Sequence, residues 1–292
     1  MAADLDRFST GVHVLDGGTG SELRRRGATP VPGAWLGPAL LGHGDTLTAI
    51  HRDFVAAGAE LCTTATFAAT PFLFEAAGLG GRWREAVHVA VRAARAAGPG
   101  PVLGALSNLP PAPDAWPAPA EETAAYGALA DALLEEGVDG LVLEMVQERT
   151  HGGRLLDAAG DRADRSGVPL WLGVSARLRA DGKLVAFDFP DRPLLPELDA
   201  LLARRRPAAL LVMHTPLEDL PFALAAVRAR WDGPLGARPE LPYAPDVPAA
   251  SEPPEDVLAR AAPAWIAAGA TLLGGCCGTR PTHVAALART VV

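Results

Sequence analysis

The sequence predicts an α/β protein built as a single (β/α)8 barrel, the TIM-barrel architecture. Eight short apolar runs, many of them rich in β-branched residues, recur along the 292 residues, and stretches long enough for helices separate them. Apolar strands that alternate with helices are typical of a parallel sheet covered by helices. Eight such units fit a barrel of roughly 250 residues plus insertions. The alternative is a doubly wound open sheet, which usually has fewer strands.

The expected elements follow one another at fairly even intervals. The expected strands are residues 12–15, 61–64, 102–105, 140–143, 170–174, 209–212, 234–237 and 271–273. The expected helices are residues 47–57, 82–97, 121–136, 194–205, 217–230, 255–268 and 282–290. Gly58, Gly137 and Gly269 each end a helix just before a strand, and this repeated order supports successive α-to-β units.

Two proline-rich stretches, 109–120 and 244–255, are expected to form loops after the third and seventh strands. Neither is long enough to be a linker between domains. We therefore predict one domain over residues 1–292.

Charge and composition exclude several classes of partner. The chain carries 26 Lys+Arg against 34 Asp+Glu, a net charge of −8, which argues against nucleic-acid and anionic-membrane partners. Every apolar run is shorter than the roughly 18–20 residues that span a membrane. Residues 1–10 are polar and do not resemble a signal peptide. We therefore expect a cytoplasmic protein that binds small molecules; no sequence pattern indicates its oligomeric state.

Reactive side chains gather where the expected strands end. In a (β/α)8 barrel the active site is built at the carboxyl ends of the strands, so these side chains should meet at one mouth. They are Asp16, Thr66, Ser107, Glu144, Ser175, His214, Arg238, Glu240, Cys276 and Cys277.

The segment Gly274-Gly275-Cys276-Cys277-Gly278 is the strongest signal of chemistry. Neighbouring strand residues point to opposite faces, so both thiols can reach one point only where the strand ends and glycines permit an irregular backbone. Two thiolates favour zinc in a reducing compartment. Two buried core thiols or a vicinal disulfide are the alternatives. Cys62 lies inside a strand, and we expect it to be an inert buried thiol.

Zinc normally takes at least three protein ligands. His214 ends the apolar strand Leu210-Leu211-Val212-Met213-His214 and is our candidate for the third. A histidine in this position can also be an ordinary core or surface residue.

Asp16 and Glu144 each follow an apolar strand, and together they could hold a substrate ammonium group. Glu144 could also be a solvated acid at the rim. The glycine-rich stretch after Asp16 lacks the order of a dinucleotide-binding fingerprint. We interpret it as a tight loop where a ligand approaches the backbone at Gly17.

At these residues the sequence resembles the zinc-dependent homocysteine S-methyltransferase family. The matching segments are 15–23, 57–67, 137–144, 168–171 and 274–281, in family order across almost the whole chain. The resemblance implies a (β/α)8 barrel and a zinc ion bound by three thiolates, two of which match Cys276 and Cys277. It assigns substrate binding to Asp16 and Glu144, and we expect Gly17, Thr66, Phe67 and Ser107 to contribute.

Two departures from the family pattern stand out. The third zinc cysteine is replaced by His214, and a tyrosine-proline-asparagine segment usual after the seventh strand is missing, with residues 237–240, Ala-Arg-Pro-Glu, in its place. We expect a zinc-dependent S-methyltransferase that moves a methyl group from a sulfonium donor, S-methylmethionine or S-adenosylmethionine, to homocysteine, giving methionine. The alternatives are a diverged enzyme that methylates another thiol or a selenol, and a non-catalytic zinc- or small-molecule-binding barrel.

Overall fold

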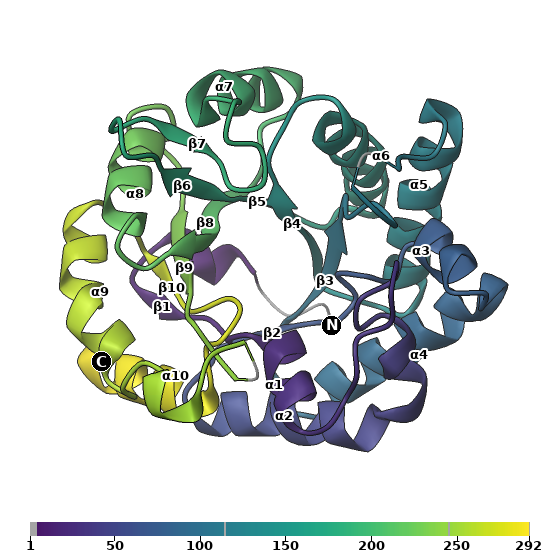
Figure 1. Ribbon diagram of the computed structural model, residues 1–292, viewed down its shortest axis with the longest axis horizontal. Helices are drawn as coiled ribbons and strands as arrows, with labels where there is room; N and C mark the ends of the chain where they lie inside the picture. Colours follow the sequence, from purple (N-terminus) through teal and green to yellow (C-terminus); the bar gives the residue numbers. More distant parts are fainter. Residues whose placement is uncertain (1–4, 114, 245, 292) are drawn as a thin grey trace.

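The computed structural model contains eight parallel strands in one curled sheet, with helices on its outside (Figure 1). It describes residues 5–113, 115–244 and 246–291. Residues 1–4 and 292, the two ends of the predicted domain, lie outside the described residues, as does part of the polar opening segment. The strands of the sheet are β1 (His13–Val14), β2 (Cys62–Thr63), β3 (Val102–Ser107), β4 (Gly140–Val146), β5 (Leu170–Val174), β8 (Ala209–Pro216), β9 (Leu235–Glu240) and β10 (Leu272–Leu273).

The strands neighbour one another in the order β1-β10-β9-β8-β5-β4-β3-β2. From β2 to β10 each strand lies beside the one that follows it in this sheet, and β1 and β2 stand at the two ends of the order. The two ends of this order, β1 and β2, meet where the backbone N–H of Glu60, just before β2, donates to the Val14 carbonyl at 2.8 Å. The Asp16 carboxylate, just after β1, also accepts a hydrogen bond from the Thr63 backbone N–H of β2. This arrangement confirms the predicted TIM-barrel class.

Helices surround the sheet, and short 3-10 turns connect several of them. No helix in the described part of the chain is both long and apolar enough to cross a membrane. The α-helices are α1 (Thr19–Arg25), α2 (Gly44–Ala56), α3 (Pro71–Ala76), α4 (Trp83–Arg95), α5 (Pro119–Glu135), α6 (His151–Ser166), α7 (Leu194–Arg204), α8 (Leu220–Arg228), α9 (Val257–Ala267) and α10 (Pro281–Val291). The 3-10 turns are η1 (Asp6–Ser9), η2 (Pro38–Gly42), η3 (Gly80–Arg82) and η4 (Ala249–Ser251).

All eight expected strands and all seven expected helices are present, with ends that differ by a few residues. The expected elements do not include α1, α3, α6 or an antiparallel hairpin of β6 (Ala176–Leu178) and β7 (Leu184–Ala186). Glycines obscure α6 in the sequence. The helix begins where the Glu148 carboxylate accepts hydrogen bonds from three successive backbone N–H groups, at Thr150, His151 and Gly152, a carboxylate cap that offsets the weak helix propensity of glycine.

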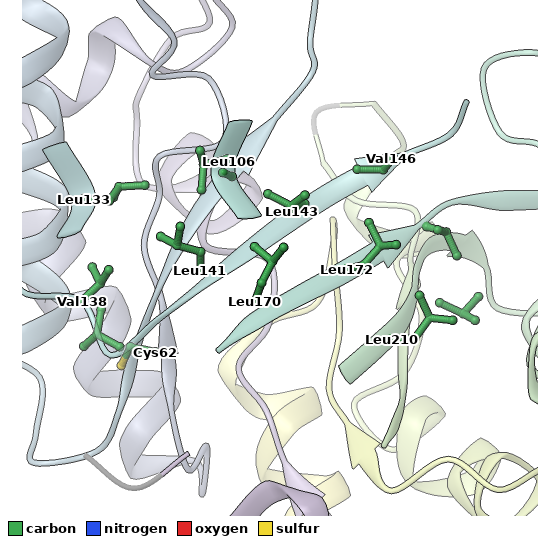
Figure 2. Packing of buried hydrophobic residues seen from close by; sticks show 14 of the residues in the cluster. Cys62, Leu106, Leu133, Val138, Leu141, Leu143, Val146, Leu170, Leu172 and Leu210 are labelled. Atoms are coloured by element: carbon green, nitrogen blue, oxygen red, sulfur yellow. The ribbon is translucent and has the colours of Figure 1, made fainter. Parts of the chain in front are cut away.

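Two layers of apolar side chains make up the core. The outer layer lies between the sheet and the helices, and Figure 2 shows Leu141 and Leu143 of β4 beside Leu170 and Leu172 of β5 within it. The alternate residues point into the barrel. These inward residues include Leu15, Leu61, Leu103, Ala105, Val142, Trp171, Ala209, Leu211 and Leu272.

The amino-terminal end of the barrel is plugged by side chains. Phe8 of η1 is buried and packs edge-on against Trp171, with ring centroids 5.8 Å apart. Leu5 belongs to the same apolar cluster. A packed interior at this end leaves the carboxyl ends of the strands to form the site.

Candidate metal centre and substrate pocket

A cavity of about 430 Å³ lies at the carboxyl ends of the strands. This volume suits a small ligand, since ligand pockets usually measure about 300–1,000 Å³. Its charged, thiol and imidazole groups come from the loops or strand ends around β4, β8, β9 and β10. They are Glu144, His214, Arg238, Glu240, Cys276 and Cys277, with Asp246 from the loop after β9.

His214, Cys276 and Cys277 form the candidate metal centre. Each offers one ligand atom, and the three atoms lie within 4.8 Å of one another. Cys276 Sγ is 3.8 Å from His214 Nδ1. A sulfur and a nitrogen bound tetrahedrally to one zinc ion lie about 3.6 Å apart. The donor types and their spacing therefore fit a zinc ion, with a fourth position left for a ligand in the cavity.

His214 is held in place from two sides. Its Nε2 lies 3.3 Å from Glu240 Oε2, and its ring meets the Phe187 ring edge-on at 4.6 Å. A carboxylate on one ring nitrogen fixes the tautomer and directs the other nitrogen toward a metal. The sequence predicts that Glu240 lies at the mouth but assigns it no role.

The backbone at His214 departs from regular strand geometry. The pairing of β8 with β9 shifts register between Met213 and Pro216, and His214 has a φ of +45°. The pairing of β4 with β5 shifts in the same way between Leu143 and Val146. Bulges of this kind re-aim side chains beside active sites. Here they present Glu144 and His214 to the cavity.

Three non-glycine residues in the described chain have a positive φ: Trp35 (+45°), Met145 (+55°) and His214 (+45°). All three line this cavity. Such conformations cost about 1–3 kcal/mol each and cluster at functional sites. Their coincidence supports this cavity as the functional site.

Close backbone contacts position the cysteine pair. Cys276 N donates to the Pro239 carbonyl at 2.8 Å, and Leu241 N donates to the Cys277 carbonyl at 2.8 Å. Gly278 has a φ of +76°, which glycine adopts without strain. A Cβ at Gly274 would lie 2.7 Å from the Asp16 carbonyl oxygen. The expected glycine frame around the thiols is therefore present.

The two thiols influence each other's ionisation. A hydrogen bond from Cys277 lowers the pKa of Cys276 well below its usual range, and His214 and Arg238 act in the same direction against burial. The same pairing, together with burial, raises the pKa of Cys277. Burial disfavours the charged form of His214, but Cys276 and Glu240 outweigh it and raise the pKa of the imidazole. Cys276 thus has strong thiolate character, the form in which cysteine binds metals.

Asp16 and Glu144 lie on either side of Arg238, which is 3% exposed. Arg238 Nη2 donates to Asp16 Oδ1 at 2.9 Å, and its Nη1 lies 3.8 Å from Glu144 Oε1. Burial raises the pKa of Asp16 despite Arg238 and Thr63, and it raises the pKa of Glu144 to about 8. Glu144 lines the cavity, whereas Asp16 is fully buried and absent from its lining.

Some of the remaining predicted residues line a cavity, and others are buried beside it. Gly17 and Phe67 line the cavity. Ser107 donates to the Phe67 carbonyl at 2.6 Å and lines a neighbouring cavity. Thr66 is fully buried and donates to the Ala105 carbonyl at 2.6 Å. Cys62 belongs to the outer core layer, where burial raises the pKa of its thiol to about 12, consistent with an inert thiol.

The neighbouring cavity of about 930 Å³ opens beside the first, and the two share Trp35, Phe67, Leu109 and Met145 in their walls. Trp116, Phe189 and Asp188 also line it. Sequence patterns do not predict Trp35, Met145 or Trp116 at the site, because none of them lies in a motif.

The sequence profile described as homocysteine S-methyltransferase matches residues 13–291. Homocysteine S-methyltransferase of Escherichia coli (strain K12) is 30% identical over 300 residues, covering 94% of this chain and 93% of that protein. Homocysteine S-methyltransferase YbgG of Bacillus subtilis is 25% identical, with the same coverage. The crystal structure of metallated MmuM from Escherichia coli superposes with a TM-score of 0.72 at 24% identity, covering 96% of each chain, and it supports the barrel fold. The chain therefore belongs to the homocysteine S-methyltransferase family of methyltransferase enzymes.

Proposed function

We propose that this protein is a zinc-dependent methyltransferase that moves a methyl group from a sulfonium donor to a thiol, with homocysteine as the reference acceptor and methionine as its product. The observation that carries the proposal is the meeting of His214, Cys276 and Cys277 at the wall of a ligand-sized cavity. Family membership supports the reaction type. The sequence favours one domain over residues 1–292 and a cytoplasmic location, which we propose with it.

The metal would be held by the two sulfurs and by His214 Nδ1. Bound zinc is a Lewis acid that lowers the pKa of a ligating thiol and keeps its sulfur nucleophilic near neutral pH. With one histidine and two thiolates, the protein's donor set balances the charge of the ion, whereas three thiolates would leave a negative site. We therefore expect a more acidic and less nucleophilic bound thiol than three thiolates would give.

The surrounding residues have separate tasks in this proposal. Glu240 orients the His214 ring, and the apolar walls formed by residues such as Trp35 and Met213 exclude water from the reacting sulfur. The neighbouring cavity supports donor binding, because aromatic faces such as those of Trp35 and Trp116 attract cations. Transfer forms a bond from the acceptor sulfur to the methyl carbon and breaks the bond to the sulfonium sulfur. The donor leaves as a neutral thioether, and the thiol proton is lost to solvent.

Purified protein with its metal content measured would test the proposal. We expect about one zinc per chain and methionine formation, detected by mass spectrometry, from homocysteine with either S-methylmethionine or S-adenosylmethionine. Parallel reactions with each donor identify the one used. Zinc-loaded protein that methylates no thiol with either donor would contradict the proposal.

A further inference from the structure

Arg238 occupies the position between the two carboxylates of the pocket. Its Nη2 donates to Asp16, its Nη1 faces Glu144, and its Nε donates to the Gly275 carbonyl at 3.0 Å. Three contacts in three directions fix the guanidinium, which stays charged at all physiological pH values. The cation that this acid pair attracts is therefore supplied by the protein itself.

Asp16 has no free side toward the cavity. Its Oδ2 accepts from the Thr63 backbone N–H at 2.5 Å, and its Oδ1 accepts from Thr63 Oγ1 at 3.0 Å and from Arg238. The side chain is fully buried, while Arg238 and Glu144 line the cavity. A ligand in the cavity thus meets the guanidinium before it can reach Asp16.

We propose that Arg238 determines the acceptor class, and that the preferred acceptor is a thiol that presents an oxygen group, such as a carboxylate, to Arg238 and needs no ammonium group. The inference rests on the proposed thiol methylation. An ammonium group directed at the acid pair would meet a like charge at close range, which is unfavourable in a buried site. This differs from the expectation that Asp16 and Glu144 together hold a substrate ammonium.

The hydrogen-bonding capacity of Arg238 points to the same class of acceptor. A guanidinium has five N–H donors, and the Gly275 carbonyl and the Asp16 carboxylate engage two of them. Arg238 is also among the residues that line the cavity, and an N–H group that a ligand contacts there is complemented by an oxygen acceptor and not by another donor such as an ammonium group.

Homocysteine and 4-mercaptobutanoate form a matched pair of acceptors, because they differ only in the α-amino group. With wild-type protein and one donor, we expect kcat/KM for 4-mercaptobutanoate to equal or exceed that for homocysteine, and to be at least about one third of it. In Arg238→Met the acid pair loses its cation, and we expect the ratio to move toward homocysteine by about tenfold or more. Arg238→Lys keeps the positive charge and should keep the wild-type ratio. Arg260→Met, a change on the exposed face of α9, is the control for arginine loss elsewhere.

A wild-type preference for homocysteine of more than about threefold would overturn the inference, and so would an unchanged ratio in folded Arg238→Met. If that variant does not fold, the Arg238→Met/Asp16→Asn double variant removes the cation and one buried acid together. Calorimetric affinities of the two thiols for zinc-loaded protein provide a readout independent of turnover. If no methyl transfer occurs but the ratio of the affinities for 4-mercaptobutanoate and homocysteine is as expected, only the proposed function is contradicted. If neither thiol binds, the acceptor assignment is overturned as well.

Discussion

A half-buried histidine and a fully buried one, in different regions of the barrel, show how surroundings distinguish a site from a core. His214, at the end of β8, lies between Glu240 and Cys276, and these partners raise the pKa of its imidazole against the effect of burial. His51, in α2, is fully buried, and neither ring nitrogen has a hydrogen-bond partner among the described residues. Burial alone lowers the pKa of His51 to about 4. Burial therefore does not make a histidine a ligand; a directed carboxylate and a facing thiol do.

The largest expected effect is the loss of zinc when the two cysteines near His214 are replaced. Replacement of both Cys276 and Cys277 by serine should abolish zinc binding, because His214 alone cannot hold the ion. Metal analysis of the purified protein measures the loss. Cys62→Ala is the matched control and should keep about one zinc per chain, since Cys62 lies in the outer core layer. Unchanged zinc content in the double variant would refute the cysteine assignment.

The next effect compares the two histidines directly. His214→Ala should lower zinc affinity by more than about a hundredfold, because two ligands cannot complete the site. His214→Cys should retain zinc, with three thiolate ligands. His51→Leu should retain it too, because His51 is not among the residues that line the cavity. Competition with a chelator gives the affinities, and X-ray absorption gives the ratio of sulfur to nitrogen ligands. Near-stoichiometric zinc in His214→Ala would show that His214 only packs at the strand end.

His51 should govern part of the acid sensitivity of the fold. Its folded pKa of about 4 lies below the ordinary value of 6.5, so the unfolded chain binds the additional proton between these values. Stability is therefore lost as the pH falls from about 6.5 toward 4, by about 3 kcal/mol at pH 4. Urea unfolding of wild type and His51→Leu at pH 7 and pH 4 measures the difference. An equal loss of stability in both proteins would contradict this account.

Glu240 should have the smallest of these effects. Glu240→Gln keeps the size of the side chain but removes the negative charge that orients His214, so zinc affinity should fall about 10- to 100-fold. Glu60 is the matched control, because it holds His13 Nδ1 at 2.9 Å beside β1, away from the cavity. Glu60→Gln should leave zinc affinity unchanged. Equal zinc affinities in Glu240→Gln and the wild type would remove the orienting role from Glu240.

Much of the fold was predictable because apolar strands and glycine-terminated helices leave local signals. The cysteine pair was predictable for a similar reason, since the glycines beside the thiols are visible in the local sequence and Gly278 has the positive φ that favours glycine. Helix α6 was missed because the cap that begins it, the Glu148 carboxylate, outweighs the glycines that argue against a helix.

The sequence by itself determined the eight strands, the end of the barrel that carries the chemistry, and the residue types available there. Only the tertiary structure decided how those side chains combine. The alternation of side chains along a strand does not predict the register shifts beside Glu144 and His214. A shift of one residue reverses the face to which a side chain points. The alternation also does not predict that Arg238 reaches Asp16, 222 residues away in sequence. That contact exists because the curled sheet brings the start and the end of the chain together, and it determines which charge the pocket presents to a ligand.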